Sequence, residues 1–391
     1  MKTTIYVTTQ KLFYRRTNNM KKSALHLLLI LGLLFISTGE VSAQSSKTFK
    51  VGKGGTLDIV TTFGDIKIKS WDKNEILVKY DIDEDEEIYS GIKFNQNGND
   101  LTIRATQGYG TSFDITVPVN FNLKIVTSAG DIHLVNAITG EVNASTSGGD
   151  VTLSDVTGKV KLTTGGGDVR TGNIKGTATV SSSGGDLNAG VVDGDAVFTT
   201  GGGNVQIATG SKTLTVSTAG GNVSVGNTGG NATVTTGGGN ISLGKVGGTA
   251  VVKTGGGDIK VDNVSGDVKG VTGSGNITLH SSEDKVNVVS GSGDLVVSFY
   301  PGASGDSKVV TGFGDIKLYI PENSRTTIVA KVREGGWGDS KNNDAIKSDF
   351  PITTENKDGI SIITHYQLNG GGSTIYVETG SGTIELRKLK K

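Results

Sequence analysis

The sequence predicts an all-β fold: a single elongated β-solenoid of 18-residue coils, each with two short strands, and irregular β caps at both ends. The first observation is that a Gly followed by Asp or Asn recurs at every eighteenth residue. The positions are Asp150, Asp168, Asp186, Asn204, Asn222, Asn240, Asp258, Asn276 and Asp294. The second is that Val, Ile or Leu follows each of them. A fixed short period is typical of a solenoid, in which each repeat is one coil stacked on the next.

One coil can be followed through residues 149–166. Val151 and Leu153 alternate with a polar residue, which is the pattern of a half-buried strand. A second alternating segment places Val160 and Leu162 inward, and a glycine run closes the coil. Stacking by eighteen residues therefore aligns apolar side chains in columns. One predicted column contains Val151, Val169, Leu187, Val205, Val223, Ile241, Ile259, Ile277 and Leu295.

The N-terminal segment predicts export. Residues 20–43 combine a basic start (Met20-Lys21-Lys22), an apolar run and the small-residue site Val41-Ser42-Ala43, the pattern of a cleaved signal peptide. Residues 1–19 are then a misassigned start or an extended n-region. The alternative is a retained membrane anchor, but the run is shorter than the ~20 residues of a spanning helix. We expect the periplasm, the cell surface or the extracellular space.

The remaining chain divides into three predicted segments. Residues 44–126 alternate irregularly and form an N-terminal β cap, residues 127–300 form the regular solenoid, and residues 301–391 form a C-terminal β segment and cap. The sequence Phe-Gly-Asp-Ile-Lys occurs both at 63–67 and at 313–317, which suggests that both ends derive from one coil unit. Caps are expected because terminal coils expose unpaired strand edges.

Composition excludes several classes of function. The chain has no Cys, which excludes disulfides and thiolate metal sites, and its formal net charge is zero. General attraction to nucleic acid or to an anionic membrane is therefore not implied. No membrane insertion is expected after signal cleavage, since no later apolar stretch reaches spanning length.

The Asp/Asn column is the most obvious candidate site. Stacked carboxylates attract Ca²⁺, yet four of the nine positions are neutral Asn and the opposite turn lacks a steady carboxylate. The favoured interpretation is structural: both residue types accept hydrogen bonds from nearby backbone N–H groups after a Gly at positive φ.

A column of hydroxyl residues has a similar double interpretation. It contains Thr164, Ser182, Thr200, Thr218, Thr236, Thr254, Thr272 and Ser290. Regular Thr arrays occur on ice-binding solenoids, but outward residues such as Val197 and Lys253 interrupt this array. The favoured interpretation is that these residues favour strand formation and that their hydroxyl groups are hydrogen-bonded within the fold. Between Phe198 and Gly244 the only charged residue is Lys212. Such an uncharged face suits hydrogen bonding to sugars. The favoured interpretation, however, is that these residues only complete the repeat and bind nothing.

Other candidates predict no chemistry. The acidic run 81–87 is expected to be a solvated loop. His133, His280 and His365 are far apart in sequence and lack partners for a triad or a zinc site. We therefore predict no catalytic, cofactor-binding or metal-ligating residues and no cofactor.

The motifs together resemble a bacterial family of exported putative adhesins of unknown function, related to adhesin head domains. Gly64-Asp65-Ile66 leads to Trp71-Asp72, Val117-Pro118 precedes another Gly-Asp-Ile turn, and the glycines of 370–372 lead to 380–384. The likeness covers most of residues 56–387, and the long uniform run of coils departs from it. The resemblance implies the solenoid fold and surface attachment, with no catalytic residues to carry over.

The sequence thus predicts an exported, non-enzymatic adhesin-like or cell-envelope scaffold protein that binds through its solenoid faces or caps. The partners it allows are glycans and envelope or surface components, with the oligomeric state left open. One alternative is a polysaccharide-acting β-helix enzyme, although the outward positions Thr152, Arg170, Asn188, Gln206, Ser224, Ser242 and Lys260 include no carboxylate. The other is a calcium-stabilised repeat protein.

Overall fold

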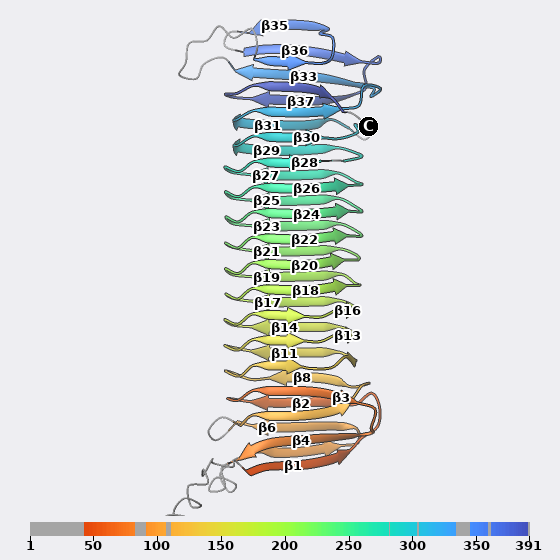
Figure 1. Ribbon diagram of the computed structural model, residues 1–391, viewed down its shortest axis with the longest axis vertical. Coiled ribbons are helices and arrows are strands. Elements are labelled where there is room, and N and C mark those ends of the chain that lie inside the picture. The colour runs from red at the N-terminus through yellow and green to blue at the C-terminus, as the bar shows by residue number, and fades with distance from the viewer. Residues whose placement is uncertain are drawn as a thin grey trace, which may run out of the picture.

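The chain forms an all-β rod (Figure 1), as predicted. The computed structural model describes residues 43–82, 91–106, 111–280, 282–302, 305–333, 345–358 and 361–389, and no helix occurs among them. The predicted signal peptide up to residue 42, residues 1–19 and most of the acidic run lie outside the described residues. Two sheets face each other along the whole described rod.

Sheet A contains one strand, or two short ones, from each coil. In stacking order it runs through β1 (Ala43–Lys50), β4 (Glu75–Ile82), β7 (Phe113–Pro118), β3 (Ile66–Trp71), β9 (Ile132–Leu134), β12 (Val151–Leu153), β15 (Val169–Thr171), β18 (Leu187–Val192), β20 (Val205–Gly210), β22 (Val223–Thr228), β24 (Ile241–Val246), β26 (Ile259–Val264), β28 (Ile277–Leu279), β30 (Leu295–Ser298), β32 (Ile316–Ile320), β38 (Ile384–Lys388) and β34 (Ile346–Ser348). Short strands continue the earliest coils of this sheet: β10 (Ile138–Thr139), β13 (Val156–Thr157) and β16 (Ile174–Lys175).

Sheet B supplies the opposite face. Its stacking order is β5 (Lys93–Asn97), β6 (Asp100–Ala105), β2 (Thr56–Thr61), β8 (Asn122–Val126), β11 (Val142–Thr146), β14 (Val160–Thr164), β17 (Ala178–Ser182), β19 (Ala196–Thr200), β21 (Leu214–Thr218), β23 (Ala232–Thr236), β25 (Ala250–Thr254), β27 (Val268–Thr272), β29 (Val286–Ser292), β31 (Ser307–Phe313), β37 (Ser373–Thr379), β33 (Thr326–Arg333), β36 (Ser361–Leu368) and β35 (Thr354–Asp358).

The regular coils stack in parallel with an offset of eighteen residues. Strand β14 pairs with β17 so that Leu162 lies opposite Val180, and the same register continues from coil to coil. Because side chains alternate across a strand, like residues lie above one another inside the rod. The predicted apolar column from Val151 to Leu295 is confirmed, with each side chain at most 1% exposed.

Both ends depart from sequence order. The first coil, β2 and β3, lies between later strands: β2 pairs with β6 and β8, and β3 pairs with β7 and β9. The last coil is inserted in the same way, because β37 pairs with β31 and β33 while β38 pairs with β32 and β34. The sequence did not predict this interleaving. It leaves antiparallel strands at the outermost positions.

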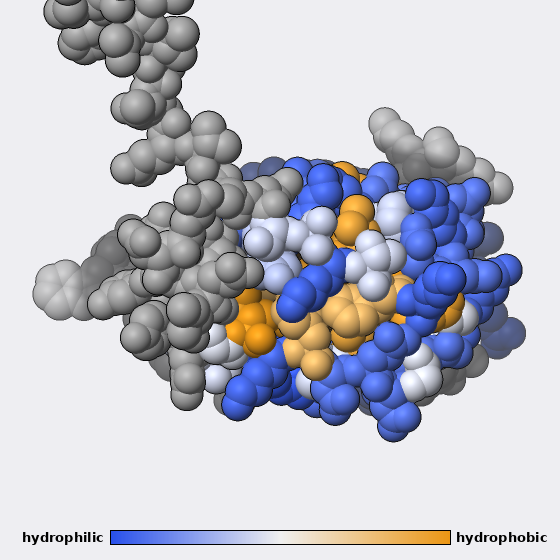
Figure 2. Space-filling view, turned by 90° about the horizontal axis from the view of Figure 1, so that it is seen from below, coloured by the Kyte–Doolittle hydropathy of each residue, from blue (hydrophilic) through white to orange (hydrophobic). Residues whose placement is uncertain are grey.

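Aromatic side chains pack at the β1 end of the core. The Phe94 ring lies 5.6 Å from the ring of Phe49 and 5.6 Å from that of Tyr80, and Lys47 Nζ lies 4.5 Å above Phe94. Figure 2 views this end and shows apolar residues surrounded by hydrophilic ones. The large rings shield apolar groups that an open coil would expose to water.

Candidate functional site

The Asp/Asn column forms a continuous hydrogen-bonded ladder, here called the Asx ladder, along the edge where sheet B passes into sheet A. In each step the side-chain Oδ1 accepts a hydrogen bond from the backbone N–H of the equivalent residue in the next coil. The accepting residues are Asp65, Asp131, Asp150, Asp168, Asp186, Asn204, Asn222, Asn240, Asp258, Asn276, Asp294 and Asp315. Asp and Asn both carry this oxygen, which explains why they exchange along the column.

The hydrogen-bonding role of the ladder agrees with the sequence prediction, but the predicted reason for its glycines is wrong in the regular coils. A positive φ occurs before the ladder residue at Gly64 (98°) and Gly314 (142°), at the two ends. In between, the constraint is close backbone approach: a Cβ on Gly239 would lie 2.1 Å from the carbonyl oxygen of Gly221. The stacked backbones leave no room for a side chain there.

The ladder carboxylates do not gather into a cation site. Arg170 lies beside two of them, with its guanidinium 2.8 Å from Asp168 and 3.7 Å from Asp150. Across the described residues, no group of three or more His, Cys, Asp or Glu side chains could hold a metal ion. With each Oδ1 bonded to backbone, the ladder is an element of the fold.

The hydroxyl column is buried, and its hydroxyl groups bond to backbone in a second ladder. Thr218 Oγ1 donates to the carbonyl oxygen of Gly203 at 2.9 Å and accepts from the backbone N–H of Gly221 at 3.2 Å. Thr164, Thr200, Thr236, Thr254 and Thr272 repeat this geometry. The prediction of satisfied hydroxyls is therefore confirmed, and these groups are not available to a ligand.

The middle of the rod presents uncharged side chains outward on both sheets. On sheet B, Thr215 pairs with Thr233 and Ser217 with Thr235, while on sheet A Ser224 pairs with Ser242. These six side chains are partly or fully exposed and make no hydrogen bond to another described residue. We call the outward face of residues 198–244, in which Lys212 is the only charged residue, the uncharged band. Parallel pairing places its hydroxyl groups in files with the ~4.8 Å spacing of neighbouring strands.

The outward positions that the polysaccharide-acting alternative concerned lie on sheet A. Positions from Thr152 to Lys260 pair in one file on sheet A, and none carries a carboxylate. His133 lies in β9, His280 follows β28, and His365 lies in β36, so the structure does not bring them together.

A charged group spans three strands of sheet B near the β1 end. The Asp58 carboxylate lies 2.9 Å from Arg104 and 3.2 Å from Lys124. Partial burial raises the pKa of Asp58, but the hydrogen bonds and positive charges of Arg104 and Lys124 outweigh it and hold the pKa below its usual range. The arrangement links β6, β2 and β8 across the interleaved coil.

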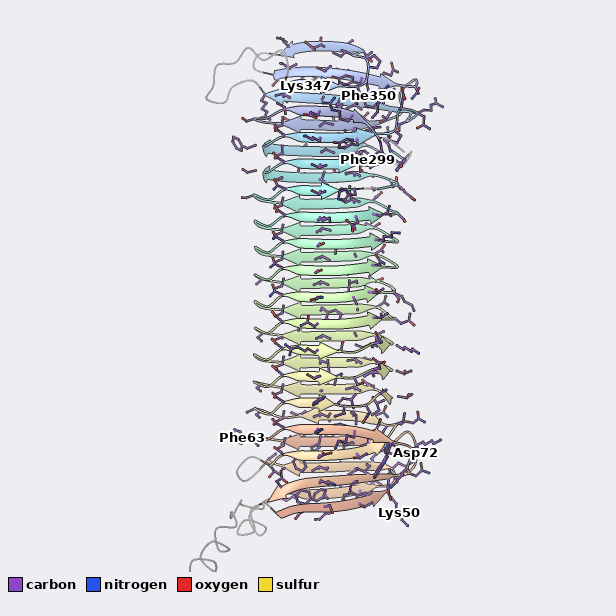
Figure 3. All side chains as sticks on the ribbon, viewed as in Figure 1. Lys50, Phe63, Asp72, Phe299, Lys347 and Phe350 are labelled. Atoms are coloured by element: carbon purple, nitrogen blue, oxygen red, sulfur yellow. The ribbon has the colours of Figure 1, made fainter. Side chains whose placement is uncertain are left out.

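Sequence reasoning missed one pocket, on the edge opposite the Asx ladder. Its volume is about 160 Å³, and we call it the Trp71 pocket. It is lined by Lys53, Trp71, Asp72, Asn74, Pro118, Val119 and Asn120. Figure 3 shows Asp72 at this edge and Phe63, beside the ladder, at the other. Two motifs of the family resemblance, Trp71-Asp72 and Val117-Pro118, meet here because Trp71 pairs with Pro118 across β3 and β7. Only this long-range pairing reveals the pocket.

Comparison with known protein families finds a match in the C-terminal part of the chain. Residues 198–387 match the family described as Toastrack DUF4097. The family resemblance seen in the sequence is thereby confirmed. The matched segment runs from β19 to β38 and therefore includes the uncharged band and the C-terminal interleaved coil.

Solved structures with similarity to the chain share little sequence with it. One is a putative cell adhesion protein from Clostridium sporogenes, with 12% identity, coverage of 89% of this chain and 99% of that one, and a TM-score of 0.17. Another is a putative adhesin from Bacteroides fragilis, with 12% identity, coverage of 89% and 97%, and a TM-score of 0.20. A putative lipid binding protein from Parabacteroides distasonis has 13% identity, coverage of 72% and 94%, and a TM-score of 0.23. These TM-scores are too low to transfer any property. No curated protein matches the chain.

No helix in the described part of the chain is long and apolar enough to cross a membrane.

Proposed function

We propose that this protein is an exported, non-enzymatic adhesin-like or cell-envelope scaffold that binds glycans or other envelope components through its solenoid faces or caps. The observation that carries the proposal is that the polar side chains of the protein fall into two sets, one bonded to backbone and one facing solvent. The repeated Asp, Asn and Thr residues of the two ladders bond to backbone, whereas the outward hydroxyl groups of residues such as Thr215, Thr233 and Ser224 make no hydrogen bond to another described residue.

The uncharged band suits an extended, uncharged polymer. Serine and threonine hydroxyl groups both donate and accept hydrogen bonds, as sugar hydroxyl groups do. A file such as Thr215 and Thr233 offers such groups at regular intervals along one straight direction. Each contact is weak, so useful affinity would come from many of them on a rigid surface that needs no ordering on binding.

Retention of envelope material tests the proposal. The exported chain is immobilised and incubated with cell-envelope polysaccharide fractions, and attachment of a deletion strain is measured beside it. We expect retention of a glycan or envelope component and reduced attachment. Thr215→Glu/Thr233→Glu on sheet B and Ser224→Glu/Ser242→Glu on sheet A then show which face binds, since each pair leaves the core unchanged. No retention by the unaltered protein, together with normal attachment of the deletion strain, would overturn the proposal.

A further inference from the structure

The Trp71 pocket is built by three turns that lie far apart in the sequence. Backbone hydrogen bonds join them: Val119 N–H donates to Trp71 O at 2.9 Å, Gly54 N–H to Asn120 O at 2.8 Å, and Val51 N–H to Asn74 O at 3.1 Å. These bonds lie within the protein, so the walls are joined by its own backbone. Pre-formed pockets avoid the entropic cost of ordering their walls on binding.

The indole ring of Trp71 is held in one orientation. Its Nε1–H donates to the carbonyl oxygen of Glu75 at 2.8 Å, and Lys73 Nζ lies 4.6 Å from the ring centre. Together with buried Pro118 and Val119, which is 39% exposed, the ring gives the pocket a rigid apolar wall. A large flat aromatic group offers contact area at little cost in side-chain freedom.

The rest of the lining is polar and has no partner within the described chain. The side chains of Lys53, Asp72, Asn74 and Asn120 are exposed and make no hydrogen bond or ion pair with another described residue. They supply an ammonium donor, a carboxylate acceptor and two amides that can do both. Lys53 and Asp72 carry opposite charges, so the pocket has no net charge to attract an ion.

We propose that the Trp71 pocket binds a single pyranose ring of a neutral saccharide. One face of a pyranose carries C–H groups that match the apolar wall, while its hydroxyl groups both donate and accept, as the mixed polar lining requires. The volume of about 160 Å³ lies below the ~300 Å³ at which pockets for drug-sized ligands begin, so one ring of a longer chain fits. This site rests on the proposed function and adds a defined position and ligand class to it.

Tryptophan fluorescence provides the test. Trp337 is the only other tryptophan, so Trp337→Phe in the exported chain leaves Trp71 as the sole reporter. The probes are glucose, galactose, mannose and N-acetylglucosamine, titrated to tens of millimolar because a single ring in an open pocket is expected to bind with Kd of about 1 mM. We expect a saturable change in Trp71 emission with at least one of them.

Variants then locate the site. Asp72→Ala and Asn120→Ala each should weaken binding about tenfold, since each removes hydrogen bonds to the sugar. Asp193→Ala, an exposed aspartate in a turn of a regular coil, is the matched control and should bind normally. Thermal melts verify that all variants fold. Absence of a saturable change with all four sugars overturns the proposal, as does binding that Asp72→Ala and Asn120→Ala weaken no more than Asp193→Ala. Because envelope retention is measured separately, either failure leaves the wider proposed function standing.

Discussion

The Oδ1 atom of Asp258 accepts a 2.8 Å hydrogen bond from the backbone N–H of Asn276, its counterpart one coil further along the rod. Because this bond needs an oxygen and no charge, Asp258→Asn should change the free energy of unfolding by less than about 0.5 kcal/mol. Asp258→Ala should destabilise by about 1 kcal/mol. Urea unfolding of both variants checks this. Equal losses in the two variants would show that the charge, and not the hydrogen bond, matters.

Neighbouring glycines of one turn should respond very differently to alanine. A Cβ on Gly239 would lie 2.1 Å from Gly221 O, whereas a Cβ on Gly238 would meet nothing within 4 Å. We expect Gly239→Ala to cost about 2–4 kcal/mol because the backbones must separate, and Gly238→Ala to stay within about 0.5 kcal/mol. Thermal melts of the pair measure the difference. A tolerated Gly239→Ala would contradict the close stacking of the coils.

The buried hydroxyl ladder should be more sensitive than the exposed hydroxyl groups. Thr218→Val keeps the shape of the side chain but leaves Gly203 O and Gly221 N–H without their partner. A loss of about 1–3 kcal/mol is expected. Thr215→Val, on the outward face of the same strand β21, is the control and should be nearly neutral. Similar urea midpoints for the two variants would argue against the ladder.

Acid should weaken the interleaved coil through Asp58. Its pKa is depressed in the folded protein, so its stabilising contribution is present above the unfolded pKa of ~3.9 and is lost as the pH falls through the lower folded pKa. Asp58→Asn should therefore reduce the difference in unfolding free energy between pH 7 and pH 3. Adding Lys124→Gln to Asp58→Asn should produce little further change. An unaltered pH dependence in Asp58→Asn would sink this expectation.

Calcium should not contribute to stability. The Oδ1 atoms of the Asx ladder accept from backbone, and the described residues contain no group of acidic side chains suited to a metal ion. The melting temperature is expected to stay the same with EDTA and with millimolar Ca²⁺, because a ligand stabilises a fold only where it binds the native state. A rise in melting temperature on adding Ca²⁺ would restore the calcium-stabilised alternative.

The part of the fold that follows a local rule could be read from the sequence. The eighteen-residue spacing of residues such as Asp186 and Asn204 gives the coil length, and the alternation of Val160 and Leu162 with polar residues gives the face that each side chain takes. Both signals repeat in every coil, so they reinforce one another. The hydrogen-bond partner of each ladder residue was harder to predict from the sequence, because that partner lies in the next coil and not in the same turn.

What only the tertiary structure decided lies at the ends of the rod and at its edge. The placement of β2 between β6 and β8 depends on pairing between segments more than 40 residues apart, and no period survives there to predict it. The same pairing brings Trp71, Pro118 and Lys53 together. Local side-chain patterns determine whether a strand forms and which face is buried, but the choice among competing strand partners rests on the free energy of the whole assembled stack.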